Sequence, residues 1–172
     1  ILSYHAILER VERALGRRGR LLDVGCGRGE LLEAAQERGW SVTGVDISPA
    51  FADYARRRVG AEVLCGELAG LGLPEASFDA VCLVSVLQHT AHPKETLRAV
   101  HRVLKAGGAL YLETMNNESL VYKLGDLYYW LRRKPITMNL SPTFPSYQIY
   151  GFSPRPMRRL LGDLGFEAVD LS

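Results

Sequence analysis

The feature that most constrains this chain is a glycine at every second position, directly after a short apolar run. Residues 20–24 read Arg-Leu-Leu-Asp-Val, which is typical of a central parallel strand covered on both faces. Gly25, Gly27 and Gly29 follow, where the missing Cβ permits positive φ and lets a ligand lie against the backbone. Apolar residues at helical spacing begin after Glu30, so the free N–H groups of a helix start would face this loop. Such a loop favours an anionic ligand group.

The residues at the end of the loop argue against two common nucleotide motifs. A dinucleotide fingerprint requires a small residue where this chain has Glu30, which disfavours a nicotinamide oxidoreductase. A phosphate-binding P-loop ends in Gly-Lys-Ser or Gly-Lys-Thr, and the sequence Gly-Arg-Gly-Glu offers no such lysine. What remains is a loop for a ligand that contains adenosine but no pyrophosphate.

A second strand pattern supplies an acid for the same ligand. Residues 40–46 alternate in polarity and end in Asp46, about 20 residues beyond the first glycine, where α/β sites place the acid that accepts from ribose hydroxyls. We therefore predict that Asp46 binds the ribose. The alternative is a capping or turn aspartate before Ser48 and Pro49.

The two segments around these acids, residues 23–29 and 44–48, resemble the first two motifs of the class I S-adenosylmethionine-dependent methyltransferases. The resemblance continues in the family's order and spacing through residues 65–67, 73–74, 77–80, 86–89 and 102–108. Together these segments span roughly residues 15–115. Several ordered motifs are a specific signal where one glycine loop would be a weak one.

Strand and helix patterns alternate along the chain. Strands are expected at residues 20–24, 40–46, 61–65, 77–87, 109–113 and 167–171. Helices are expected at residues 1–15, from residue 30 on, and at 50–59, 94–104 and 154–164. This alternation predicts an α/β fold with parallel strands and right-handed crossovers. With the resemblance, it implies one domain over residues 1–172 with a Rossmann-like, doubly wound, mostly parallel sheet, helices on both faces, and the family's final antiparallel strand missing from this chain.

The resemblance implies a methyl transfer that uses S-adenosyl-L-methionine and leaves S-adenosyl-L-homocysteine. The methionine end of the cofactor is assigned to Asp23 and the glycine loop, the ribose to Asp46, and the adenine to Glu67 and the backbone N–H of Leu68. The full set of predicted cofactor-binding residues is Asp23, Gly25, Cys26, Gly27, Gly29, Asp46, Ile47, Glu67 and Leu68.

The expected reaction is an in-line displacement onto an oxygen or nitrogen of a small-molecule acceptor, saccharide or quinone-like, with no covalent intermediate. For a hydroxyl acceptor a nearby base would help, and His89 follows the fourth strand pattern. The alternative for His89 is a structural histidine that caps the following turn. Glu113 and Tyr150 are predicted on the acceptor side. A non-catalytic module that binds the cofactor to regulate a partner would carry the same cofactor residues.

Residues 114–152 interrupt the alternation of strands and helices. A stretch this long between sheet elements is usually functional, and the resemblance implies a lid or substrate-binding insertion over the acceptor. The stretch is rich in tyrosine and also contains Trp130. The alternative is that these aromatic residues form a homodimer contact or a membrane-surface contact.

Composition narrows the partners and the compartment. The 172 residues carry a net charge of +2 with both signs interleaved, so no nucleic-acid footprint is expected. Cys26, Cys65 and Cys82 are dispersed, which predicts neither a disulfide framework nor a metal site and favours the cytoplasm. No apolar run has the length of a membrane span or the form of a leader. Because the chain starts at Ile1 and stops at Ser172 within an expected strand, we expect it to be part of a longer protein.

Overall fold

The computed structural model of the protein describes residues 3–114, 128–134 and 152–169. Five strands form one sheet in the order β3-β2-β1-β4-β5, and every neighbouring pair is parallel. The strands are β1 (Arg20–Val24), β2 (Ser41–Asp46), β3 (Glu62–Cys65), β4 (Phe78–Val84) and β5 (Leu104–Glu113). The predicted α/β fold with a parallel sheet is confirmed.

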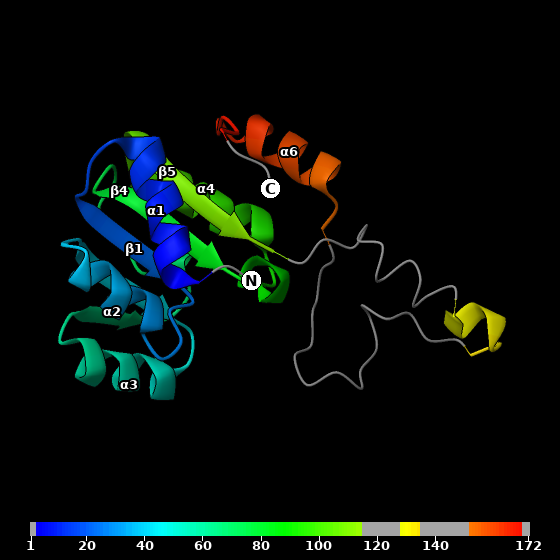
Figure 1. The fold of residues 1–172 in the computed structure, drawn as a ribbon, viewed down its shortest axis with the longest axis horizontal. Coiled ribbons are helices and arrows are strands. Elements are labelled where there is room, and N and C mark those ends of the chain that lie inside the picture. The colour runs from blue at the N-terminus through cyan, green and yellow to red at the C-terminus, as the bar shows by residue number, and fades with distance from the viewer. Residues whose placement is uncertain (1–2, 115–127, 135–151, 170–172) are drawn as a thin grey trace.

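Helices cover both faces of this sheet (Figure 1). The α-helices are α1 (Tyr4–Leu15), α2 (Glu30–Glu37), α3 (Pro49–Val59), α4 (Pro93–Val103) and α6 (Pro154–Asp163). Two 3₁₀ turns, η1 (Leu68–Gly70) and η2 (Leu87–His89), follow β3 and β4. The side chains of Ser3 and Ser48 cap α1 and α3, because each accepts a hydrogen bond from the first turn of its helix.

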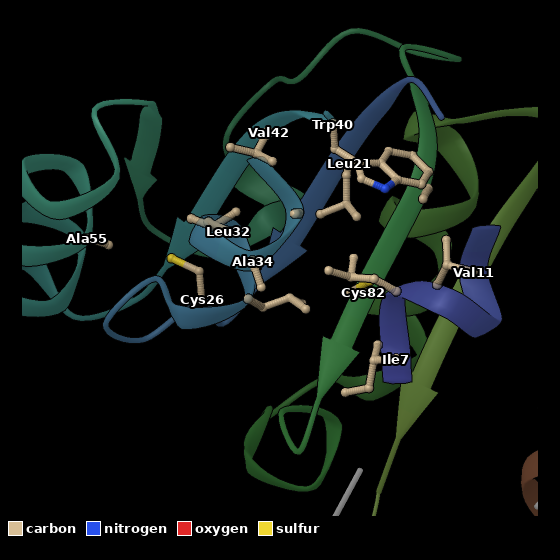
Figure 2. Close-up of a cluster of buried hydrophobic side chains, with 14 of the residues drawn as sticks. Ile7, Val11, Leu21, Cys26, Leu32, Ala34, Trp40, Val42, Ala55 and Cys82 are labelled. Carbon is tan, nitrogen blue, oxygen red and sulfur yellow. The ribbon is translucent and has the colours of Figure 1, made fainter. Parts of the chain in front are cut away.

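Two apolar layers hold the helices to the sheet. On one face, buried residues of α1, α2 and α3 pack on β1 and β4, and Figure 2 shows Ile7, Val11, Leu21, Leu32 and Cys82 in this layer. On the other face, buried residues of α4 and Met157 of α6 pack on the same two strands. β1 and β4 are therefore covered on both sides, as their nearly continuous apolar sequences predicted.

Two predicted strand boundaries were wrong by several residues, and the described part of one predicted strand is not a strand. β4 ends at Val84 rather than near residue 87, because Ser85 takes a left-handed φ of 56° and leaves the sheet. β5 begins at Leu104 rather than at residue 109, and the register against β4 shifts between Phe78 and Ala80. The run 106–108 thus lies inside the strand as an irregularity instead of ending α4. Residues 167–169 form no strand, and the rest of the strand expected at 167–171 lies outside the described residues.

Glu12 of α1 contacts the connection between α2 and β2. Its carboxylate accepts two hydrogen bonds of 2.9 Å from the Arg38 guanidinium and one of 3.1 Å from the indole of Trp40. The hydrogen bonds from Arg38, and after them those from Arg18, hold the pKa of Glu12 below its ordinary range. The carboxyl-terminal part of α1 is thereby tied to the segment that connects α2 with β2.

Asp79 anchors the amino end of β4. The side chain is 2% exposed and contacts Arg17 at 2.6 Å and Lys105 at 2.8 Å. It also accepts a hydrogen bond of 2.9 Å from the backbone N–H of Arg20. Burial alone would raise the pKa of Asp79, but the hydrogen bonds from Lys105 and Arg20 outweigh it, and the pKa is lowered. One carboxylate thus links the amino ends of three neighbouring strands.

We expect Asp79→Asn to lower the free energy of unfolding by about 1–3 kcal/mol at neutral pH, because the buried group loses its charge-assisted hydrogen bonds. The folded-state pKa of Asp79 lies below its unfolded value. In the unaltered protein, the charged carboxylate therefore contributes its full stability above about pH 4, and this contribution is lost as the pH falls through the folded pKa. The difference in stability between the two proteins should shrink over the same pH range. Urea unfolding of both proteins over this pH range measures the effect.

The matched control is Asp53→Asn. Asp53 pairs with Arg56 on the surface of α3, where the carboxyl side chain is 58% exposed. Exposed pairs contribute little, so the control should unfold like the unaltered protein. Equal losses in the two variants would show that the Asp79 contacts are no stronger than a surface pair.

Candidate functional site

The loop between β1 and α2 is fixed by backbone hydrogen bonds to β2. The N–H groups of Gly25 and Cys26 both donate to the carbonyl of Val45, at 2.7 and 3.0 Å. Gly25, Gly27 and Gly29 all have positive φ, 73°, 53° and 83°. The turn predicted from the glycine spacing is confirmed, and Gly29 caps α2, whose first N–H groups adjoin the loop.

The three glycines are required for different reasons. A Cβ on Gly25 would lie 2.4 Å from Cγ2 of Val86, and one on Gly29 would lie 2.8 Å from Cγ2 of Val59. These two positions therefore let the loop approach η2 and α3. A Cβ on Gly27 would meet nothing within 4 Å in the described part of the chain. The loop is thus packed at its ends and open at its middle, where a ligand can approach the backbone.

Asp46 supports this loop from the end of β2. It is 7% exposed, and its two carboxylate oxygens accept hydrogen bonds of 2.8 Å from the backbone N–H groups of Gly27 and Ser48. The Ser48 contact is the turn role that the sequence left open as an alternative. Each oxygen keeps a further lone pair, so a ligand can still bind there. The ribose role of Asp46 stays a prediction.

Asp23, at the centre of the site, is a buried carboxyl without a partner among the described residues. It is 3% exposed, and no hydrogen bond or cation within the described residues acts on its carboxyl group. Burial raises its pKa well above the ordinary range, and the carboxylates of Asp46 and Glu30 raise it further. A bound cation would reverse this effect. The site is therefore complementary to a positively charged group.

The remaining cofactor candidates lie at the same edge of the sheet. The N–H of Gly66 donates to the carbonyl of Asp46 at 2.9 Å, which places Glu67 one residue beyond this contact. Glu67 is exposed, whereas Leu68 is buried and packs in the apolar layer under α4. Ile47 is 68% exposed, whereas Cys26 is buried and its thiol pKa is raised to about 12 by burial. Cys26 is thus a packing residue, not a nucleophile.

A second polar cluster lies where β4 and β5 end. Glu113 accepts hydrogen bonds from Ser85 Oγ at 3.4 Å and from Tyr111 Oη at 3.2 Å. Gln88, 2% exposed, accepts one of 3.2 Å from Thr114. Burial, and then the Glu113 carboxylate, raises the pKa of Tyr111 to about 12, so this hydroxyl remains a proton donor. The structure thus surrounds the predicted Glu113 with partners that the sequence did not reveal.

His89 is exposed at the end of η2, and its backbone N–H donates to Val86 at 2.8 Å. A groove with a volume of about 1490 Å³ follows the edge of β5 between α1 and α6, and its polar end includes His89, Glu113 and Gln88. Tyr150 and most of the predicted lid at 114–152 lie outside the described residues. No group of three potential metal ligands exists in residues 3–114, 128–134 and 152–169.

Two further residues near the loop gave no sequence signal. Burial raises the pKa of Tyr4, as do the nearby charges of Glu30, Asp23 and Glu113, which places the first turn of α1 beside the acidic site. Tyr54 of α3 receives the Arg28 guanidinium on its ring, 5.1 Å from the centroid, and a hydrogen bond of 3.3 Å at its hydroxyl. Only tertiary packing brings these residues to the loop.

Comparison with known proteins finds a family model described as "Methyltransferase domain", which matches residues 22–112. The ubiquinone biosynthesis O-methyltransferase of Pseudomonas paraeruginosa is 37% identical over 114 residues, which cover 59% of this chain and 47% of the relative. This chain thus spans about half the length of the curated relatives that it matches.

Solved structures give the same result. A SAM-dependent methyltransferase from Archaeoglobus fulgidus matches with a TM-score of 0.72 and 26% identity, over 95% of this chain and 67% of that one. An amino pentose methyltransferase from Micromonospora echinaspora, solved with SAM bound, matches with a TM-score of 0.59 and 30% identity, over 66% of this chain and 52% of that one.

We expect Gly25→Ala to cost more stability than Gly27→Ala. Both substitutions force alanine into a left-handed conformation, at roughly 1–2 kcal/mol. Gly25→Ala also drives a methyl group into the stiff side chain of Val86, for about 1–3 kcal/mol more. Denaturant unfolding of both variants measures the difference. Equal costs would show that the loop moves freely away from Val86.

Proposed function

The chain belongs to the S-adenosylmethionine-dependent methyltransferases, and on that premise we propose that it methylates an oxygen or nitrogen of a small-molecule acceptor. The observation that carries this proposal is the buried carboxyl of Asp23, which lies near the acids Asp46 and Glu30 and two residues before the glycine loop. A sulfonium nucleoside with an α-ammonium group is positively charged, and this positive charge would compensate the buried carboxylates of the site.

The cofactor residues divide by position along the sheet edge. Asp23 and the loop 25–29 would hold the methionine end, with the carboxylate of Asp23 facing the ammonium group. Asp46 would accept from the ribose hydroxyls through the lone pairs that Gly27 and Ser48 leave free. Exposed Ile47 would cover the adenine, while Glu67 and the N–H of Leu68 would bind its edge. The pairing of β2 with β3 beside these two acids supports their assignment to one nucleoside.

The acceptor would bind on the other side of the loop, at the ends of β4 and β5. When bound, the cofactor supplies an already activated methyl group, so the protein must mainly position the acceptor and exclude water. Glu113, held by Ser85 and Tyr111, would orient an acceptor hydroxyl or amine. His89 would take up the proton that a hydroxyl acceptor releases. We assign Tyr150 and the 114–152 insertion to the same acceptor side.

The names of the relatives support a small acceptor with a hydroxyl or amino group. One works in ubiquinone biosynthesis as an O-methyltransferase, and another methylates an amino pentose. A hydroxylated ring, quinone-like or saccharide, would bind at the polar end of the groove, at Gln88, His89 and Glu113. The free thiols of Cys26, Cys65 and Cys82 support a reducing compartment, and we propose the cytoplasm.

We expect Asp23→Asn to weaken S-adenosylmethionine binding about 10- to 100-fold, because the cation loses a charge-assisted partner. In the unaltered protein the raised pKa of Asp23 means that the bound cation must displace a proton at low pH. Affinity should therefore rise with pH until the pH passes this pKa, whereas the variant should show no such rise. Calorimetry over a pH series measures both effects.

Asp163→Asn, at a 71% exposed position of α6, removes the same charge away from the site and should leave the affinity unchanged. NAD serves as the competing ligand in the same experiment. Binding of NAD in the absence of S-adenosylmethionine binding would contradict the proposed function.

We expect His89→Gln to lower kcat for hydroxylated acceptors by about 10²- to 10⁴-fold while cofactor affinity stays constant. The control is His92→Gln, an exposed histidine three residues further on whose backbone carbonyl accepts from α4. Release of S-adenosylhomocysteine with a panel of hydroxylated and amine acceptors measures turnover. Tight cofactor binding without turnover of any acceptor would favour a non-catalytic binding module instead.

A further inference from the structure

The short helix of residues 128–131 exposes an unusual amount of apolar surface. Tyr128, Trp130 and Leu131 are 52%, 72% and 66% exposed, whereas the chain's other tryptophan, Trp40, is 4% exposed. Figure 1 shows this helix, in yellow, standing apart from the sheet. A cluster of large apolar side chains in this position indicates an interaction surface.

Three cationic residues, 132–134, follow the helix directly in the sequence and form a tight turn at its end. Arg133 has a left-handed φ of 52°, its N–H donates to Trp130 at 2.9 Å, and the N–H of Lys134 donates to Tyr129 at 3.0 Å. This is the hydrogen-bond pattern that ends a helix in a Schellman motif. The Arg132 guanidinium lies 5.2 Å from the ring centroid of Tyr128. Apolar and basic groups are thus presented together.

The charge of this turn is not neutralised within the described residues. None of their ion pairs involves Arg132, Arg133 or Lys134, and all three are exposed. The basic run on α3 differs, because Arg56 pairs with Asp53, and Arg58 pairs with acids of α2. The cations at 132–134 are therefore available to an anionic partner outside this part of the chain.

We propose that residues 128–134 dock the protein on an anionic lipid surface. Tyrosine and tryptophan favour the depth of the lipid headgroups because one end of each ring is polar. Leu131 would reach the acyl boundary, and Arg132, Arg133 and Lys134 would pair with lipid phosphates. None of the described helices is long and apolar enough to cross a bilayer, so the attachment is peripheral. This surface does not depend on the proposed methyl transfer.

The test is sedimentation of the full chain with vesicles of phosphatidylglycerol and phosphatidylcholine, compared with vesicles of phosphatidylcholine alone. We expect binding to the anionic vesicles and much weaker binding to the neutral ones. The triple substitution R132Q/R133Q/K134Q should weaken binding roughly 100-fold, at about fivefold for each cation near the surface. W130A should also weaken binding. On vesicle binding, the tryptophan emission should shift to shorter wavelength through Trp130, since Trp40 is already buried.

The matched control is R155Q/R158Q/R159Q, which removes the same charge from exposed positions of α6. It should bind anionic vesicles nearly as well as the unaltered protein. Equal losses in the two triple variants, or binding indifferent to W130A, would overturn the proposal. Displacement of the protein from vesicles by a single-stranded oligonucleotide would also overturn the proposal, because it would indicate a nucleic-acid partner. A dimer that W130A converts to a monomer, with no vesicle binding by either protein, would indicate a second copy of the chain as the partner. Unchanged thermal unfolding of W130A confirms that the fold is intact.

Discussion

The site depends on how closely the loop after β1 approaches its two neighbouring strands. Two successive N–H groups of the loop share the Val45 carbonyl, and Asp46 accepts from a third at Gly27. On the other side, only a glycine at position 25 leaves room for Val86. These contacts fix the loop before any ligand is present. The acids of β1 and β2 are consequently held together in spite of their mutual repulsion.

Local sequence signals were sufficient to predict most elements of the fold. The glycine loop and the apolar strands gave the alternating pattern, and the acid at the end of β2 gave the predicted ribose contact. The boundaries failed where tertiary structure decided. A Cβ on Gly108 would meet Leu104 and the backbone of Lys105 and Asp79 within 3.1 Å. Gly107 and Gly108 lie inside β5, where the register against β4 shifts. In the sequence, two glycines after an apolar helix pattern indicate the end of that helix instead.

The acceptor side was less predictable than the cofactor side. Asp23, Asp46 and Glu67 lie at or just beyond the carboxyl ends of β1, β2 and β3, so the edge of the sheet that they share follows from parallel topology alone. The partners of Glu113 depend instead on the pairing of Val84 with Glu113 and on a left-handed serine just beyond it. Neither the register between separate strands nor a strained φ at Ser85 leaves a pattern in the sequence. The same holds for Tyr4 and Tyr54, which come from helices packed over the loop.

The anchor at Asp79 has a consequence for how this protein can change. Asp79 lies at the amino end of β4, while Ser85 and Glu113 lie at the carboxyl ends of β4 and β5, a strand length of roughly 20 Å away. We therefore expect substitutions in the anchor to change the free energy of unfolding more than the shape of the candidate site. Selection, or an engineer, can therefore tune durability and specificity as nearly independent traits.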